Sequence, residues 1–250
     1  MPKLDTIFLR TPDPERLSAF YRDILGMHER EDGTIGYAEN EAGLRFENGD
    51  GHYAMSRDDL YWKISISVPD IDLACRQLSG LGVDVDGPEQ FGDVAYVAHI
   101  KDPAGFVIEL LDHRFKGMRP LLELDETRLG GGPCLNLLTL RSNDIRQVHR
   151  DCLAAGMTPV SIVPVPDHGF TLYFYAYTNE RLLGDDLYAI ENRTWVYQRP
   201  YTVLEVLFRE QATAMRRPAG HEAGYAGASI AGLPTPVDID HLLVRAARSA

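Results

Sequence analysis

The chain repeats one short pattern three times, and this internal repeat limits the folds that it can adopt. Residues 4–13, 61–70 and 135–144 are each rich in β-forming residues and each end in an aspartate. Apolar residues at helical spacing follow each aspartate, and a glycine follows each helical stretch. Aspartate before a helix and glycine after it are the usual signals of helix start and stop. Each repeat therefore begins as a strand that leads into a capped helix.

Each repeat also ends in strand-like sequence. Residues 43–47, 106–111 and 201–207 are short runs of β-forming and apolar residues that close the three repeats. The pattern predicts an α+β fold built from repeated βαβββ modules that form curved mixed sheets. We place the modules at about 4–50 and 60–113, with the third at 134–208.

The modules imply a domain organisation, which we expect to be as follows: residues 1–113 as a paired βαβββ domain, 114–133 as a linker, 134–208 as a third module, and 209–250 as a C-terminal tail. The tail is rich in Ala, Gly and Pro up to residue 236 and shows no sustained period. Residues 237–245 match the opening strand again, which leaves open an extra strand or, as the alternative, a short terminal helix or frayed tail.

The third module has no partner by count, and an open half-barrel would expose a strand edge and an apolar face. We therefore expect either a homodimer, in which the third modules of two chains meet, or closure of this module onto the first two.

The composition of the chain limits the classes of partner that it can bind. The chain has 250 residues, 44% of them hydrophobic, and a formal net charge of −12, which argues against binding to nucleic acid or to an anionic membrane. No apolar run approaches the ~20 residues needed to span a bilayer, and the N-terminus has no signal-peptide pattern. Three widely spaced cysteines favour free buried thiols. We expect a cytoplasmic protein whose partner is a small molecule.

The modules resemble a known family. Residues 64–72 and 101–111 are similar to the second half of a glyoxalase, and residues 170–177 and 202–207 to the first half of glyoxalase I. The chain thus resembles the vicinal oxygen chelate superfamily (glyoxalase I, bleomycin resistance proteins, extradiol dioxygenases) and is most similar to glyoxalase I-like proteins. The resemblance implies the fold, but this fold hosts lyases, isomerases, ring-cleaving dioxygenases and drug-sequestering proteins.

The resemblance also implies metal-ligand positions: a His or Gln on the first strand of a module and a Glu on the last. The glutamates are present as Glu109 and Glu205, whereas the first-strand positions hold Lys63 and Leu137. Neither Leu nor protonated Lys is a metal ligand. We therefore expect no tightly bound cofactor, with a divalent metal as the alternative. His241 falls in the ligand register of residues 237–245, so it completes the candidate metal set with Glu109 and Glu205.

Glu109 and Glu205 are also the candidate catalytic residues, since each alternates with apolar neighbours along its strand. A carboxylate on an apolar concave face is desolvated, which would raise its pKa toward a working value for proton transfer.

The candidate substrate-binding residues are Lys63 and Arg141, which suit an anionic group, and Tyr173 and Tyr175. The two tyrosines share one face of a strand, where they either line an aromatic-binding cup or pack against a helix. Arg141 stands where the family resemblance implies an anchor for the glutathione carboxylate. Other positions depart from the glutathione pattern, so glutathione is not supported as the ligand.

Three functions remain open. We expect a glyoxalase-like protein that binds a small molecule in a sheet-lined cup and is either a lyase or isomerase with a remodelled metal centre, or a metal-free binding or sequestering protein. An extradiol-type dioxygenase ranks last, because it requires two histidines and a carboxylate around one metal. Whether the chain is an enzyme stays open, with a lyase or isomerase favoured.

Overall fold

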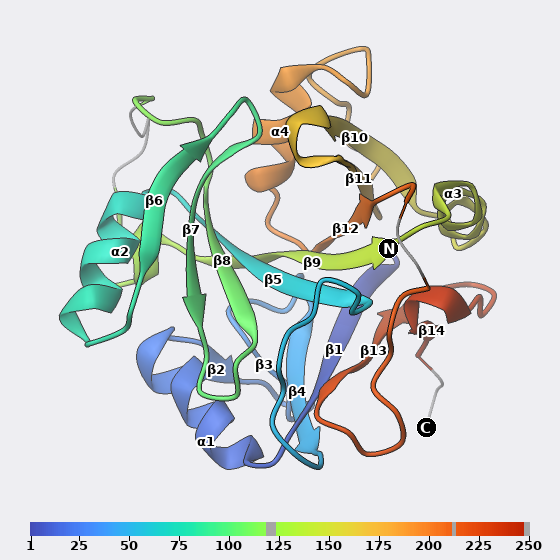
Figure 1. Ribbon diagram of the computed structural model, residues 1–250. Coiled ribbons are helices and arrows are strands. Elements are labelled where there is room, and N and C mark those ends of the chain that lie inside the picture. Colours follow the sequence, from blue (N-terminus) through green and yellow to red (C-terminus); the bar gives the residue numbers. More distant parts are fainter. Residues whose placement is uncertain (119–123, 212–213, 248–250) are drawn as a thin grey trace.

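The computed structural model describes residues 1–118, 124–211 and 214–247. The chain folds into two curved sheets, one of six strands and one of eight (Figure 1). This confirms the predicted α+β fold of βαβββ modules. Part of the expected linker, residues 119–123, lies outside the described residues. Within the described part of the chain, no helix is long and apolar enough to cross a membrane.

The eight-stranded sheet contains the second and third modules. Its strand order is β10-β11-β12-β9-β5-β8-β7-β6. The strands are β5 (Tyr61–Val68), β6 (Asp86–Phe91), β7 (Ala95–Lys101), β8 (Val107–Asp112), β9 (Cys134–Ser142), β10 (Thr158–Val165), β11 (Phe170–Ala176) and β12 (Val203–Phe208). Helices α2 (Ile71–Gly80), α3 (Ile145–Ala154) and α4 (Ile190–Tyr197) belong to the same two modules.

The six-stranded sheet joins the first module to the end of the chain, in the order β14-β13-β1-β4-β3-β2. Its strands are β1 (Lys3–Thr11), β2 (His28–Glu29), β3 (Ile35–Gly36), β4 (Gly43–Asn48), β13 (Gly224–Ala231) and β14 (Val244–Ala246). Helix α1 (Pro14–Ala19) continues as a π-helical turn at Phe20–Ile24. Figure 1 shows β13, in red, beside β1, in blue.

The predicted helix starts are confirmed. The side chains of Asp13, Asp70 and Asp144 each accept a hydrogen bond from the backbone N–H three residues later, as helix-capping aspartates do. The helices pack their apolar stripes on the sheets, so the local signals and the tertiary packing agree.

The pairing of the modules differs from the expected one. The first and second modules do not share a sheet: β5 of the second module pairs antiparallel with β9 of the third, with Lys63 opposite Thr139. The edge of β1 pairs instead with β13. The third module is therefore paired within the chain, which is the alternative that the sequence left open. A free strand edge takes the nearest matching strand whether or not it is adjacent in sequence.

The tail is more structured than its composition suggests. It supplies β13, then a 3₁₀ turn at Asp240–Leu242 and the short strand β14, in the segment where either an extra strand or a helix was expected. A side chain on Gly227 would lie 2.8 Å from the backbone oxygen of Leu243, so small residues let this end of the chain pack closely.

The eight-stranded sheet separates two apolar clusters. One face carries Ile64, Ile66, Leu138 and other side chains into the main core, which also includes residues of α1, α2 and α3 and of the six-stranded sheet. The opposite, concave face lies against a smaller cluster that includes Leu137. Because side chains alternate along a strand, Lys63, Glu109 and Glu205 fall on the concave side.

Candidate functional site

The concave face brings together a lysine and two glutamates from three strands, which we call the ion triad: Lys63 on β5, Glu109 on β8 and Glu205 on β12. The Lys63 Nζ lies 2.6 Å from Glu109 Oε1 and 3.3 Å from Glu205 Oε2. Lys63 is 1% exposed, and both glutamates are buried. The two glutamates predicted as site residues and the predicted Lys63 therefore form one site.

Two hydroxyl groups complete the triad. The Ser65 hydroxyl donates to Glu109 Oε1 at 2.7 Å, and the Thr139 hydroxyl donates to Glu205 Oε2 at 2.5 Å. Lys63 also donates to the oxygens of Ser65 and Thr139, at 3.2 and 3.3 Å. The three protons of the ammonium and the inner carboxylate oxygens are thus satisfied by hydrogen bonds, as a buried charge requires.

The triad separates the pKa values of its two acids. Burial disfavours ionisation of Glu109, but the Lys63 ammonium and the nearby His99 outweigh it and hold the pKa of Glu109 at about 2. For Glu205 burial prevails, so its pKa is raised above the ordinary value. Burial also opposes the charge of Lys63, yet the two carboxylates raise its pKa. The expectation of a raised pKa is therefore met for Glu205 and wrong for Glu109, because one ammonium lies closer to one of two acids.

His99 on β7 extends the triad toward solvent. Its Nε2 lies 3.3 Å from Glu109 Oε2, the oxygen that Lys63 does not contact, and about a third of the side chain is exposed. Its position follows from the antiparallel pairing of β7 with β8, which sets His99 opposite Glu109.

A cavity of about 270 Å³, which we call the cup, opens above the triad. Its walls are mostly apolar and aromatic and include Trp62, Phe91, Phe170 and Tyr197. The Lys63 Nζ lies 4.7 Å from the centre of the Trp62 ring, a cation–π contact. A polar floor under apolar walls is the usual make-up of a small-molecule site.

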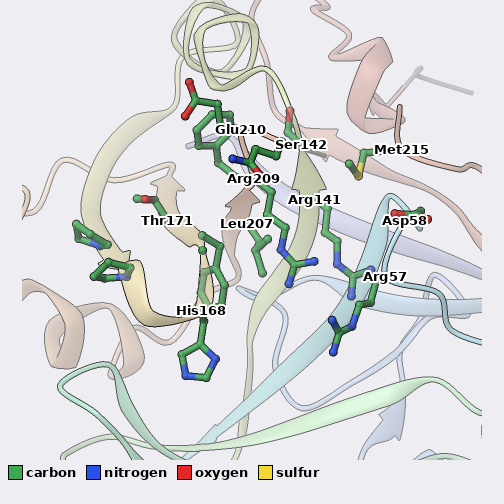
Figure 2. A pocket seen from close by; sticks show the side chains of 16 residues that line it. Arg57, Asp58, Arg141, Ser142, His168, Thr171, Leu207, Arg209, Glu210 and Met215 are labelled. Atoms are coloured by element: carbon green, nitrogen blue, oxygen red, sulfur yellow. The ribbon is translucent and has the colours of Figure 1, made fainter. Parts of the chain in front are cut away.

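A second cavity of about 650 Å³, which we call the arginine cavity, adjoins the cup and shares His168, Phe170 and Arg209 with it. Figure 2 shows the guanidinium groups of Arg57, Arg141 and Arg209 turned toward the same part of this cavity. The predicted binding residue Arg141 is therefore next to the site.

Tyr173 and Tyr175, also predicted to bind substrate, do not line either cavity. Tyr175 is buried in the main core, with its hydroxyl 3.3 Å from His149 of α3, and Tyr173 packs against Phe208. The opposite face of β11 lines the cup instead, through Leu172. Alternation along a strand defines two faces but does not tell which of them is concave.

His241 lies away from the triad. It belongs to the 3₁₀ turn before β14, and its Nδ1 is 3.2 Å from the carboxylate of Asp151 in α3. The expected set of His241 with Glu109 and Glu205 is therefore wrong. Among residues 1–118, 124–211 and 214–247, no group of three or more His, Cys, Asp or Glu side chains is arranged to hold a metal ion.

The model of the Glyoxalase/Bleomycin resistance protein/Dioxygenase superfamily matches residues 3–110. The structure of glyoxalase I from Zea mays superposes with a TM-score of 0.60 at 18% identity, over 92% of this chain and 74% of that one. The family match covers residues 3–110, and the structural similarity shows the same fold over most of the chain.

A curated protein is similar to the chain over a shorter stretch. The "Probable lactoylglutathione lyase" of Vibrio parahaemolyticus is 27% identical over 123 residues, which cover 42% of this chain and 87% of the relative.

The divalent metal that the superfamily resemblance implies does not fit the residues present. The implied ligand positions are Lys63, Leu137, Glu109 and Glu205, and the ammonium of Lys63 lies within hydrogen-bond distance of both carboxylates. A second cation there would meet a fixed positive charge, and leucine offers no donor atom.

Several site residues were missed by sequence reasoning. Ser65 and Thr139 could have been found, because each lies two residues after a first-strand ligand position and so shares its face. Trp62, Arg57 and His168 carry no such signal, because only the curvature of the sheet and the path of its loops bring them to the cavities.

Proposed function

We propose that the protein binds a small organic molecule in the cup and that the ion triad, rather than a metal, forms the polar floor of the site. The observation that carries this is the position of the Lys63 ammonium between Glu109 and Glu205. It contacts the two carboxylates that would otherwise be the metal ligands, and its hydrogen bonds are complete.

The electrostatics of the floor favour binding through hydrogen bonds and apolar contact. The ammonium supplies one positive charge, so it cannot supply the doubly charged Lewis acid of a metal-dependent lyase. The outer oxygen of Glu109 and the ring of His99 remain available to a ligand at the open side of the floor. The aromatic walls suit a flat, largely apolar ligand.

Binding of a neutral aromatic probe tests this proposal. We expect 1-naphthaleneacetamide to bind in isothermal titration calorimetry with an affinity that neither EDTA dialysis nor added Zn²⁺ or Mg²⁺ changes. Leu172→Trp should abolish binding by filling the cup, since Leu172 lines it. Leu153→Trp, at a position 47% exposed on α3, is the matched control and should bind as the wild type does. Binding that is lost in EDTA and restored by Zn²⁺ would contradict the proposal.

A lyase or isomerase is the second candidate. Two observations favour it: a buried carboxyl, Glu205, with a raised pKa, and His99 within reach of Glu109 as a proton acceptor. Such an enzyme would move protons between these groups and a ligand. An assay for formation of lactoylglutathione, with and without added divalent ions, tests this second candidate function. Turnover that Glu205→Gln abolishes would favour the enzyme, and turnover equal to that of a heat-inactivated sample would exclude this reaction.

A further inference from the structure

We infer that the arginine cavity is the anion end of the ligand site: Arg57 and Arg209 bind a carboxylate or phosphate group of an organic anion whose apolar body lies in the cup. This rests on the proposed function and adds the chemical class of the ligand.

Arg57 and Arg209 have no acidic partner among the described residues. The chain has 37 acidic and 25 basic residues, and eight arginines of its described part form an ion pair with a carboxylate, as Arg216 does with Asp59 at 2.7 Å. Among the described residues, neither Arg57 nor Arg209 has an ion-pair or hydrogen-bond partner for its guanidinium group. Two unpaired cations side by side in an acidic protein repel each other unless an anion lies between them.

Arg141 adds to the field without being free itself. Its Nη1 donates to the backbone oxygens of Ser56, Asp59 and Tyr61 at 3.0–3.1 Å, so its position is fixed. Burial lowers the pKa of Arg141 to about 10, and the charge of Arg209 acts in the same direction. A third guanidinium at the same cavity increases the attraction for an anion while leaving direct contacts to the other two.

The acids near the cavity offset this charge only in part, through the effect of Asp58 and Asp59 on Arg141. Asp58 and Glu210 are part of its lining, but no ion pair joins either to an arginine within the described chain. Figure 2 shows the Glu210 carboxylate directed away from the guanidinium groups. The planar forks of guanidinium groups match carboxylate and phosphate oxygens in geometry as well as charge.

The connection between the two cavities indicates the chemical character of the rest of the ligand. Arg209 lines both, and its guanidinium carbon lies 6.0 Å from the centre of the Phe170 ring, which also lines both. An anion held by Arg209 therefore continues directly into the aromatic walls of the cup. The ligand class that fits is an apolar, flat molecule with an acidic group at one end.

A matched set of probes tests this: 1-naphthaleneacetate, 1-naphthyl phosphate and the neutral 1-naphthaleneacetamide, each titrated by calorimetry into wild type and the Arg57→Gln/Arg209→Gln double variant. In wild type we expect at least one anion to bind about tenfold or more tighter than the amide, and the difference to shrink at high salt. The double variant should lose this preference, so that the two anions and the amide bind it with similar affinity. Arg16→Gln, an exposed arginine on α1, is the control and should keep the preference.

Each other outcome overturns the inference. If the amide binds wild type as tightly as both anions, the anion end is wrong while the proposed cup stands. If the preference persists in the double variant, Arg57 and Arg209 do not bind the anion. If Arg16→Gln removes it equally, the effect is one of overall charge. If no probe binds, the proposed function fails as well. Carboxylate and phosphate ligands are distinguished by which of the two anions binds tighter.

Discussion

Lys63 is a buried cation whose charge is compensated by two carboxylates on neighbouring strands. Its ammonium, the two carboxylates and two hydroxyl groups form one hydrogen-bonded network, so no member can be removed without leaving another unpaired. Networks of this kind contribute little over an apolar core when complete but cost much when broken.

Lys63→Met should therefore destabilise the protein by about 3–5 kcal/mol, because it leaves two buried carboxylates facing each other. Chemical denaturation followed by circular dichroism measures this free energy of unfolding. The triple variant Lys63→Met/Glu109→Gln/Glu205→Gln removes the uncompensated charges and should recover at least half of the loss. A cost below about 1 kcal/mol for Lys63→Met would show that the triad is solvated in solution.

The triad also predicts a pH dependence of stability. The pKa of Glu109 is held at about 2 in the folded protein, below the ordinary value of 4.5, so its contribution is fully present above pH 4.5 and is lost as pH falls toward 2. The loss should be roughly 3 kcal/mol. The raised pKa of Glu205 acts in the opposite sense, since its protonation relieves burial as pH falls toward 4.5.

Glu109→Gln should thus flatten the fall in unfolding free energy between pH 4.5 and 2, and Glu205→Gln should not. Denaturation curves collected at several pH values in that range measure the difference. Parallel curves for wild type and Glu109→Gln would contradict the assigned pKa.

At the scale of elements, the sequence predicted those helices and strands whose bounds depend on nearby residues. The capping aspartates, the helices after them and the closing strands β4 and β8 lie within a residue or two of their expected bounds. Strand β13 escaped prediction because Gly, Ala and Ser carry little β-propensity, and the strand forms by packing against β1. The same limit applies to Tyr175, whose place depends on which side α3 covers.

The C-terminal turn before β14 contributes to the core of the six-stranded sheet, through Leu242, which is fully buried. Leu242→Ala should cost about 2–5 kcal/mol of unfolding free energy. It should leave the affinity for 1-naphthaleneacetamide unchanged, because the cup lies on the far face of the other sheet. Leu183→Ala, at a position 66% exposed, is the control and should cost less than about 0.5 kcal/mol. A loss of probe affinity in Leu242→Ala would show that the two sheets are coupled at the site.

At the scale of the whole molecule, the two sheets share one core, and polar contacts also join them. The buried carboxylate of Glu41, before β4, accepts the N–H of Leu135 on β9 at 2.7 Å, and the Thr202 hydroxyl oxygen accepts the N–H of Ala42 at 2.8 Å. The expected homodimer rests on an unpaired third module, and pairing of β9 with β5 removes that reason. The homodimer stays a prediction, which light scattering tests.

The two halves of the eight-stranded sheet are related by an approximate twofold axis between β5 and β9, which matches Ser65 to Thr139 and Glu109 to Glu205. The same twofold operation matches Lys63 to Leu137. The two halves therefore differ at this position, since only one of them carries the ammonium group. Two identical subunits could not differ in this way, because each would bring its own lysine. In one polypeptide the two halves can differ in sequence, so a ligand that would have two equivalent orientations in a symmetric cup should have one preferred orientation here.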